Sequence, residues 1–455
     1  MSKKKRNSQK PKVVNLDSLK QLNLNAAGLD IGAAEIWACI PEDRTEENVR
    51  CFTTFTDDLH ALADWLEAHQ IDTVAMESTG IYWLPIYEIL AERGWDVCLV
   101  NARHFKNVPG RKSDVADCQW IQQLHTYGLL RGSFRPLADI VTLRAYVRHR
   151  DNIIKGRVVH IQHMQKALEL MNLKLTQVVT DMTGVTGMQI IRAIINGERD
   201  PHVLAQFRDY RCAKSEEEIA RALHGNYRPE HLFTLEQAVS AYDFATEQLQ
   251  QCDQKLEAFY ADFNPPVLPQ SDEQPPKPQR KPAKNEPYFP LREQLHQLAG
   301  VDLCDVDGLN TLTVQTILSE ISPDVSAWPT YKHFASWVGV CPYQDQSGGK
   351  IIKRDTRKNT NPANRAFRMA AQAVSNSKSA LGAYYRRMRA KFGPPKAITA
   401  TAHKIARIVY AMLKHKQAYI DPGVEAYEQQ QKDKQLKHLK KKAQKLGFEL
   451  VETSA

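Results

Sequence analysis

Short apolar runs alternate with amphipathic stretches from residue 26 to about residue 135. The runs AAGLDIG, EIWACI and VRCFTTF predict three early strands, and TVAMES and WDVCLVN predict two later ones. Between and after these later runs, DDLHALADWLEAH, YWLPIYEILAERG and DVADCQWIQQLHTYGLL have the spacing of helices. Three strands followed by alternating helices and strands predict an α/β domain with a mixed sheet.

A heptad pattern replaces this alternation from residue 139 to 175 and predicts one long helix that needs a partner. Its apolar positions are Ile140, Val147, Ile154, Ile161, Leu168 and Leu175. A second heptad series runs from Leu235 to Phe263 and opens with a possible capping box of Thr234 and Gln237. The two helices could form a coiled coil within the chain or between subunits, and the spacing leaves both open.

Two arginines interrupt the first apolar seam. Arg150 and Arg157 occupy positions where the heptad calls for apolar side chains. Either the helix packing is broken there, or these side chains face an anionic group.

A Pro-rich stretch with scattered charges, residues 264–290, marks the clearest boundary in the chain and predicts a linker. After it, apolar spacing predicts a mainly α-helical domain, which begins with two amphipathic segments around the turn VDGLN. The expected order is a basic disordered tail at 1–20, the α/β domain at 21–136, a helical region at 137–263, the linker, the C-terminal domain at 291–420 and a basic tail at 421–455.

Composition narrows the class of protein. The chain of 455 residues is longer than a domain with a single hydrophobic core usually is, so we expect more than one domain. Its 61 Lys and Arg against 52 Asp and Glu give a net charge of +9. That balance favours nucleic acid as the partner. The eight cysteines lack metal-finger spacing, and no apolar run approaches the ~18 residues of a membrane span. We therefore expect a cytoplasmic protein with reduced thiols and no structural zinc.

Four acids stand at positions that suit a metal site. Asp30 lies at the end of the first predicted strand, and Glu77 ends a later one. Asp114 and Asp117 lie three apart at the start of a helix, hence on one face. Four converging carboxylates need cations to stay ionised. Two Mg²⁺ ions, or Mn²⁺ in their place, would neutralise the carboxylates and bind both oxygens of a reacting phosphodiester.

In this order the acids resemble the RuvC-like DEDD domain of a transposase family of bacterial insertion sequences. The matching segments are GLDIG, AMESTGIYW and VNARHFKNVPGRKSDVADCQWI. The resemblance implies an RNase H/RuvC-like fold and catalytic, metal-binding roles for the four acids. Lys106, Arg111 and Lys112 precede the last two acids and form either a phosphate-binding strip or a solvated loop, with equal support.

A second block, GVCPYQDQSGGKIIKRDTRKNTNPANRAF, resembles the C-terminal domain of the same family. The resemblance makes Ser347 the recombination nucleophile, whereas the glycine-rich segment alone predicts a plain hairpin turn. Serine needs activation, and the phosphate needs cationic donors. The candidate donors are Lys350, Lys353, Arg354, Arg357 and Lys358.

The family resemblance also implies partners and a reaction. Such proteins form a serine–DNA ester, exchange strands between donor and target double-stranded DNA, and use a structured noncoding bridge RNA as guide. They assemble from dimers into tetramers in which the carboxylates of one subunit meet the serine of another. The resemblance also implies a bacterial protein that associates with the nucleoid.

Two alternatives stay open. One is a Holliday-junction endonuclease that uses water as nucleophile, and the other is a nucleic-acid-binding protein without catalysis.

Overall fold

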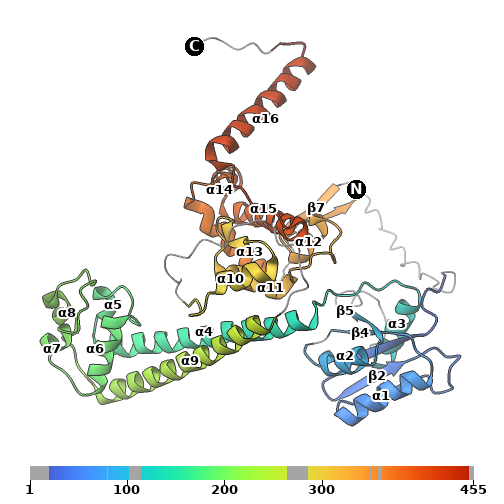
Figure 1. The fold of residues 1–455 in the computed structure, drawn as a ribbon, viewed down its shortest axis with the longest axis horizontal. Helices are drawn as coiled ribbons and strands as arrows, with labels where there is room; N and C mark the ends of the chain where they lie inside the picture. The colour runs from blue at the N-terminus through green and yellow to red at the C-terminus, as the bar shows by residue number, and fades with distance from the viewer. Residues whose placement is uncertain are drawn as a thin grey trace, which may run out of the picture. The chain divides into compact units, whose positions relative to one another are not determined.

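The structure is a computed structural model that describes residues 20–78, 80–101, 114–263, 285–348, 350–356 and 361–449 (Figure 1). Contacts divide the chain into two compact units, Met1–Arg135 and Pro136–Ala455. We call them the sheet unit and the helical unit. None of the described helices is long and apolar enough to cross a membrane, and all eight cysteines are free thiols.

The sheet unit is built on five strands in the order β3-β2-β1-β4-β5. The strands are β1 (Ala26–Ile31), β2 (Glu35–Cys39), β3 (Val49–Thr53), β4 (Thr73–Glu77) and β5 (Asp96–Val100). The first three strands pair antiparallel, while β4 and β5 continue the sheet in parallel to β1. The predicted mixed sheet is confirmed, and its topology is consistent with an RNase H-like domain.

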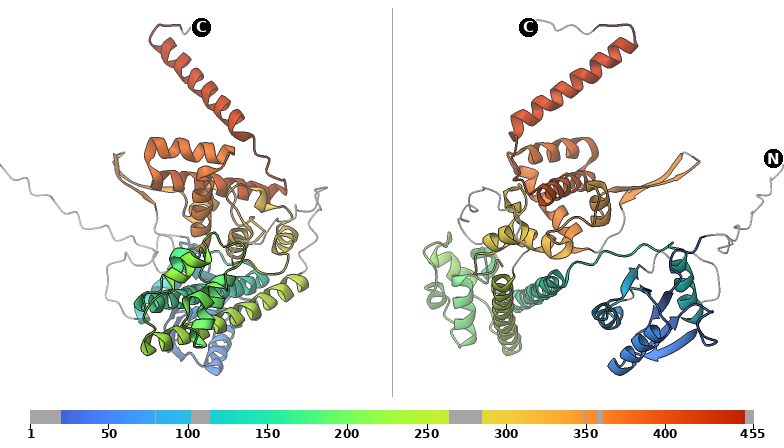
Figure 2. Two further views of the ribbon diagram at one scale, coloured as in Figure 1. Left: turned by 90° about the vertical axis from the view of Figure 1, so that its left-hand side faces the viewer. Right: turned by 45° about the vertical axis from the view of Figure 1, so that its right-hand side comes forward.

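Alternation along the strands gives this sheet two different faces. One face packs Leu29, Met76 and their neighbours against helices α1 (Thr56–Ala68) and α2 (Trp83–Glu92) to form an apolar core. The other face is covered by α3 (Asp114–Thr126), which packs against β1, β2 and β4 (Figure 2). The three helices confirm those expected from the apolar spacing.

Two long helices, α4 (Ala138–Leu170) and α9 (Pro229–Asp262), lie against each other in the helical unit (Figure 1). They run antiparallel, because Arg150 pairs with Asp253 while Arg157, further along α4, lies over the Tyr242 ring, earlier in α9. The pairing is therefore within the chain in this structure. Coiled-coil packing of the knobs-into-holes kind stays a prediction.

Four short helices connect the long pair: α5 (Leu175–Val178), α6 (Val185–Ile195), α7 (Pro201–Ala205) and α8 (Glu216–Ala222). They share one apolar core with the C-terminal end of α4 and the N-terminal half of α9. This core includes Met164, Ile191 and Leu235, which are fully buried.

The boundaries of both long helices differ from the heptad prediction. The first helix ends at Leu170, and Asn172 adopts a positive φ of 58°, so Leu175 starts a new helix instead of extending the old one. The capping box at Thr234 is wrong. Helix α9 begins at Pro229, and the Thr234 hydroxyl donates to the Glu230 carbonyl inside it. Proline at the first helical position supplies the start instead.

The chain after residue 285 is mainly helical, as expected. Its elements are α10 (Leu291–Ala299), η3 (Leu303–Asp305), α11 (Thr311–Ile321), α12 (Tyr331–Val338), β6 (Pro342–Ser347), β7 (Lys350–Thr356), α13 (Pro362–Ala373), η4 (Val374–Asn376), α14 (Ala380–Phe392), α15 (Pro394–His415) and α16 (Gly423–Lys445). Phe334 and Phe367 are fully buried with their rings edge to face. Most of the expected linker, 264–284, lies outside the described residues.

The turn VDGLN joins η3 to α11. Asn310 caps α11, because its side chain accepts a hydrogen bond from the Thr313 N–H at 2.9 Å. Gly308 has a φ of +88°, and a Cβ there would lie 2.4 Å from the carbonyl oxygen of Ala370 in α13. Glycine is thus required both by the turn and by its close packing on α13.

Candidate active site

Asp30 and Glu77 lie side by side on adjacent parallel strands. The register pairs Leu29 of β1 with Met76 of β4, so the next residues of the two strands are Asp30 and Glu77. Neighbours in register on parallel strands point to the same face of a sheet. The structure therefore brings these two acids together, as the sequence predicts.

Helix α3 brings the other two acids to the same face. A Cβ on Gly28 would lie 2.3 Å from the backbone nitrogen of Gln122, so the glycine allows α3 to rest directly on β1. Asp30, two residues further along β1, also faces α3. At the other end of the helix, His125 Nε2 lies 2.9 Å from the Thr73 hydroxyl, at the start of β4. The first turn of α3, with Asp114 and Asp117, is thus directed toward Asp30.

The electrostatics of Asp30 record this convergence. Burial, followed by the charges of Glu77, Asp117 and Asp114, raises the pKa of Asp30 from 3.8 to about 6. The backbone N–H of Ile31 acts in the opposite direction. A carboxylate whose neighbours are carboxylates is destabilised in its charged form unless a cation joins it.

The donor set fits a divalent cation. Carboxylate oxygens are the hard ligands that Mg²⁺ and Mn²⁺ prefer, and burial followed by the charges of three other acids raises the pKa of Asp30. Within the described residues, no three His, Cys, Asp or Glu side chains yet lie in an arrangement that could hold a metal. The carboxylates would therefore have to close in on the ion, which rotation of the exposed Asp114 and Asp117 side chains permits.

Trp37 is a neighbour of this site that the sequence analysis missed. It is the antiparallel partner of Asp30 on β2 and so lies on the same face of the sheet. Its indole N–H is buried and has no hydrogen-bond partner in the part of the chain that the structure describes. The alternation of EIWACI places Trp37 on one face of a strand, but only the register sets it beside Asp30.

The serine motif forms the end of a hairpin. Strands β6 and β7 pair antiparallel, with Ser347 opposite Lys350 across a two-residue turn. Gly348 in that turn has a φ of +56°, which glycine adopts without strain. The predicted short hairpin is confirmed for the backbone. Lys350 is exposed, whereas only the backbone is described for Ser347, Lys353 and Arg354.

Five of the predicted nucleic-acid contacts lie outside the described residues. They are Lys106, Arg111, Lys112, Arg357 and Lys358. Their proposed contacts with phosphates therefore stay predictions from the sequence.

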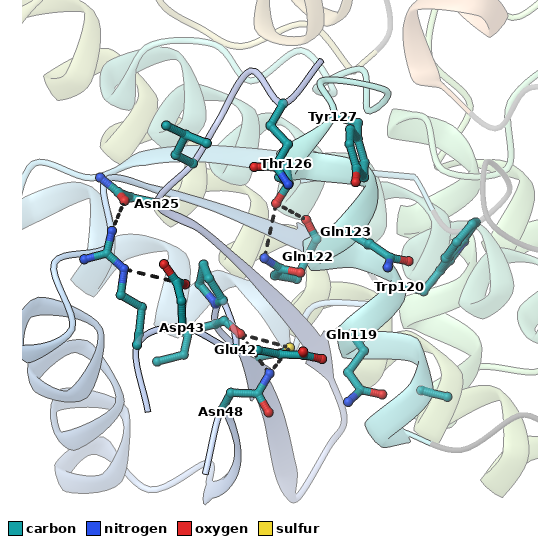
Figure 3. A pocket seen from close by; sticks show the side chains of 17 residues that line it. Asn25, Glu42, Asp43, Asn48, Gln119, Trp120, Gln122, Gln123, Thr126 and Tyr127 are labelled. Atoms are coloured by element: carbon teal, nitrogen blue, oxygen red, sulfur yellow. Dashed lines mark hydrogen bonds and ion pairs between the residues drawn. The ribbon is translucent and has the colours of Figure 1, made fainter. Parts of the chain in front are cut away.

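A cavity of about 830 Å³ opens on another part of the sheet unit, between α3 and the chain that follows β2 (Figure 3). None of the four acids lines it. Several of its polar groups are bonded to one another: Gln122 donates to the Thr126 hydroxyl, and Asn48 donates to the Ile40 carbonyl. The cavity is therefore separate from the carboxylate site, and we assign it no part in the chemistry.

Comparison with known families matches both halves of the chain. A model of DEDD transposases, described as Transposase, matches residues 27–173. A second model, described as Transposase IS116/IS110/IS902 family, matches residues 290–386. The first range contains all four acids, and the second contains Ser347. A search of curated proteins finds no match.

Proposed function

This chain is a transposase of the IS116/IS110/IS902 family, and we propose that it excises and inserts its DNA element by metal-dependent strand cleavage through a serine–DNA intermediate. The observation that carries the metal part of this proposal is the register that places Asp30 beside Glu77 on β1 and β4, under α3 with Asp114 and Asp117. The raised pKa of Asp30, caused first by burial and then by these charges, agrees with it. The serine part rests on the resemblance of the QSGGK motif and on its place at the hairpin turn.

The residues that would hold a divalent cation are Asp30, Glu77, Asp114 and Asp117. When bound, the metal would polarise the scissile phosphate and lower the pKa of an attacking or leaving oxygen. The protein's own contribution is to hold the four carboxylates on one face of the sheet. Gly28 contributes by keeping α3 in contact with β1.

Ser347 would attack the phosphorus of one DNA strand. Its hydroxyl proton leaves, a bond forms between Oγ and phosphorus, and the bond from phosphorus to a deoxyribose oxygen breaks, with that oxygen taking up a proton. One phosphoester replaces another, so the energy of the broken bond is kept for rejoining. A hydroxyl of the partner strand then reverses the step. The exposed Lys350 stands across the turn, where it can offset phosphate charge.

The nucleophile is tested by Ser347→Ala. We expect loss of recombination and of the covalent protein–DNA adduct, detected as a DNA-linked band that resists denaturing electrophoresis. Ser336→Ala, an exposed serine of α12, is the matched control and should behave as wild type. If Ser347→Ala still cleaves DNA, water is the nucleophile and the protein acts as a junction endonuclease of the RuvC type.

The metal site is tested by Asp30→Asn and Glu77→Gln. Both substitutions should abolish adduct formation. Chelation of Mg²⁺ should abolish it in the wild-type protein, and added Mn²⁺ should restore it there. Asp57→Asn, an exposed acid on α1, is the matched control. Adduct formation that survives in both variants would refute the metal site at these acids. Unchanged transposition in both, with no adduct formed by the wild type, would leave only a binding or assembly role for the chain.

We extend the proposal to a tetramer that assembles from two dimers. In it, the acids of one subunit act with the serine of another. Mixing Asp30→Asn protein with Ser347→Ala protein tests it, since mixed oligomers would contain one intact combination and regain part of the activity. No recovery on mixing, with subunit exchange verified, would mean that both groups must come from one chain.

Guidance by a bridge RNA that pairs with donor and target DNA follows from the family resemblance. The protein purified from its host should retain a discrete RNA transcribed from a flank of its own gene, and sequencing of the bound RNA checks this. Random fragments alone would contradict guidance while leaving the cleavage chemistry intact.

A further inference from the structure

One segment of the chain contains all of its excess positive charge. Between Asp355 and Asp421 there is no Asp or Glu, while 14 Lys and Arg occur. Without these 14 cations, the chain would carry five more acids than bases. Most of the segment forms helices α13, α14 and α15, and α15 lies beyond residue 386, where the second family match ends.

Four basic residues form a straight stripe along α15. Lys396, His403, Arg407 and Lys414 are spaced seven, four and seven residues apart, so they fall on one side of a helix with 3.6 residues per turn. We call them the α15 stripe. It is about 27 Å long at 1.5 Å per residue. Lys396, Arg407 and Lys414 are exposed, and His403 is half-buried.

Helix stability does not explain the stripe. The first turn of a helix favours acids and disfavours cations, because the helix dipole is positive at that end. Helix α15 nevertheless has no acid in its first turn and carries Lys396 there. Only Lys414 and His415, in the last turn, are placed where the dipole favours a cation.

Several cations of this region contact aromatic rings and carbonyl groups instead of acids. Arg407 lies 4.5 Å from the centre of the Tyr331 ring, and Lys404 lies 4.7 Å from that of Tyr384. Arg386 donates to the carbonyls of Ser375 and Ser377. Among the described residues after Arg365, no Lys or Arg forms an ion pair. Rings and carbonyls orient a cation without neutralising it.

Neighbouring cations also act on two basic groups of α15. Burial, together with the nearby charges of Lys434 and Arg407, lowers the pKa of Lys404, and Asp421 opposes this. Burial, followed by the charge of Arg407, also lowers the pKa of His403. Oriented cations that lack counterions along a helix of this length are the arrangement that binds successive phosphates of one nucleic-acid backbone.

We propose that the α15 stripe binds the phosphate backbone of the nucleic acid on which this protein acts, without reading its sequence. This inference rests on the proposed function for the presence of nucleic acid. It adds a binding surface outside the carboxylate and serine motifs. The stripe spans most of one helical turn of a duplex, which is 34–36 Å, and phosphate chemistry is shared by DNA and by a structured RNA.

The test is the salt dependence of binding by the full-length protein. In the variant Lys396→Gln/Arg407→Gln/Lys414→Gln, three phosphate contacts are removed, and each contributes about 0.9 to the slope of log affinity against log salt. The factor by which affinity drops between 50 and 200 mM salt should therefore be ~40-fold smaller for this variant than for the wild type. Random-sequence duplex DNA and a structured RNA hairpin are titrated separately. The nucleic acid for which the salt slope is reduced is the one whose backbone the stripe binds.

The control variant removes the same charge from ion-paired surface positions. Lys174, Arg192 and Lys214 pair with Glu169, Asp243 and Glu218, so their replacement by Gln changes net charge equally without removing free cations. We expect an unchanged slope. Thermal unfolding must show both variants folded, and Arg407→Lys should retain the wild-type slope. Equal slopes for the stripe variant and wild type, or equal reductions in stripe and control variants, would overturn the proposal.

The two proposals fail separately. Ser347→Ala and Asp30→Asn should lose cleavage but keep the wild-type salt slope, since neither belongs to the stripe. Cleavage that survives in those variants would refute the proposed chemistry while the slope still reports on the α15 stripe.

Discussion

Both units of this transposase contain carboxylates that are at least half-buried, but their surroundings differ. In the helical unit, Asp253 and Glu320 are only 5% and 3% exposed, and each is bound by arginine from α4. In the sheet unit, Asp30 has other carboxylates for neighbours, and its pKa rises to about 6.

The difference lies in what surrounds each carboxylate, arginine in the helical unit and other carboxylates at Asp30. Arg150 binds Asp253 and also donates to the Asn285 carbonyl at 2.7 Å, so it joins α4, α9 and the start of the C-terminal helices. Arg148 binds both carboxylate oxygens of Glu320 in α11, at 2.8 and 2.9 Å. These pairs are complete within the protein. At Asp30, by contrast, burial and the charges of the other three acids raise the pKa.

The largest effect is expected from breaking the buried pair. Arg150→Met should lower the free energy of unfolding by ~3–5 kcal/mol, because Asp253 stays buried without its partner. Arg150→Met/Asp253→Leu should recover most of that loss, since the uncompensated charge is gone. Chemical denaturation of both variants measures this. A double variant as unstable as the single one would show that shape, and not charge, makes the pair necessary.

Gly28→Ala should come next. Its Cβ would lie 2.3 Å from backbone of α3, so the helix has to move away from β1 and carry Asp114 and Asp117 with it. A shift of ~1 Å in such groups costs ~100-fold in rate. Single-turnover cleavage is the measurement. Gly156→Ala, where the added Cβ meets nothing within 4 Å, is the control and should cleave as wild type.

Asp30→Asn should stabilise the metal-free protein at pH 8, by on the order of 1 kcal/mol once solvent screening is allowed for. The pKa of Asp30 is raised to about 6 in the folded state. The folded protein therefore holds this proton more tightly than the unfolded chain, and stability falls as pH rises from about 4 to 6. The gain should disappear at pH 4. Thermal unfolding in a chelator at both pH values checks it, and an equal gain at both would contradict the charge argument.

The smallest effect is expected from an exposed pair. Arg192 and Asp243 lie 2.7 Å apart with side chains 50% and 42% exposed. Arg192→Ala should change the free energy of unfolding by less than ~1 kcal/mol, because water screens the pair. A loss as large as that of Arg150→Met would remove the distinction between buried and exposed pairs on which the comparison depends.

The sequence predicted the elements of the fold better than their ends. Alternation and helical spacing are local properties, so the five strands of the sheet and helices α1 to α3 follow from them. The start of α9 was predicted at Thr234 instead of Pro229, because the polar residues before the heptad obscured the first turn. The seam arginine Arg150 left two alternatives, and only the structure shows an acid opposite it.

What the sequence determined by itself is the set of charges: four acids at the ends of strands and the start of a helix, and a long segment with cations and no acids. What only the tertiary structure decided is which charges are neutralised. Arg150 and Asp253 are 103 residues apart, and Trp37 meets Asp30 through strand register. The physical reason is that periodicity depends on neighbours along the chain, whereas compensation of a charge depends on what packing places within a few ångströms of it.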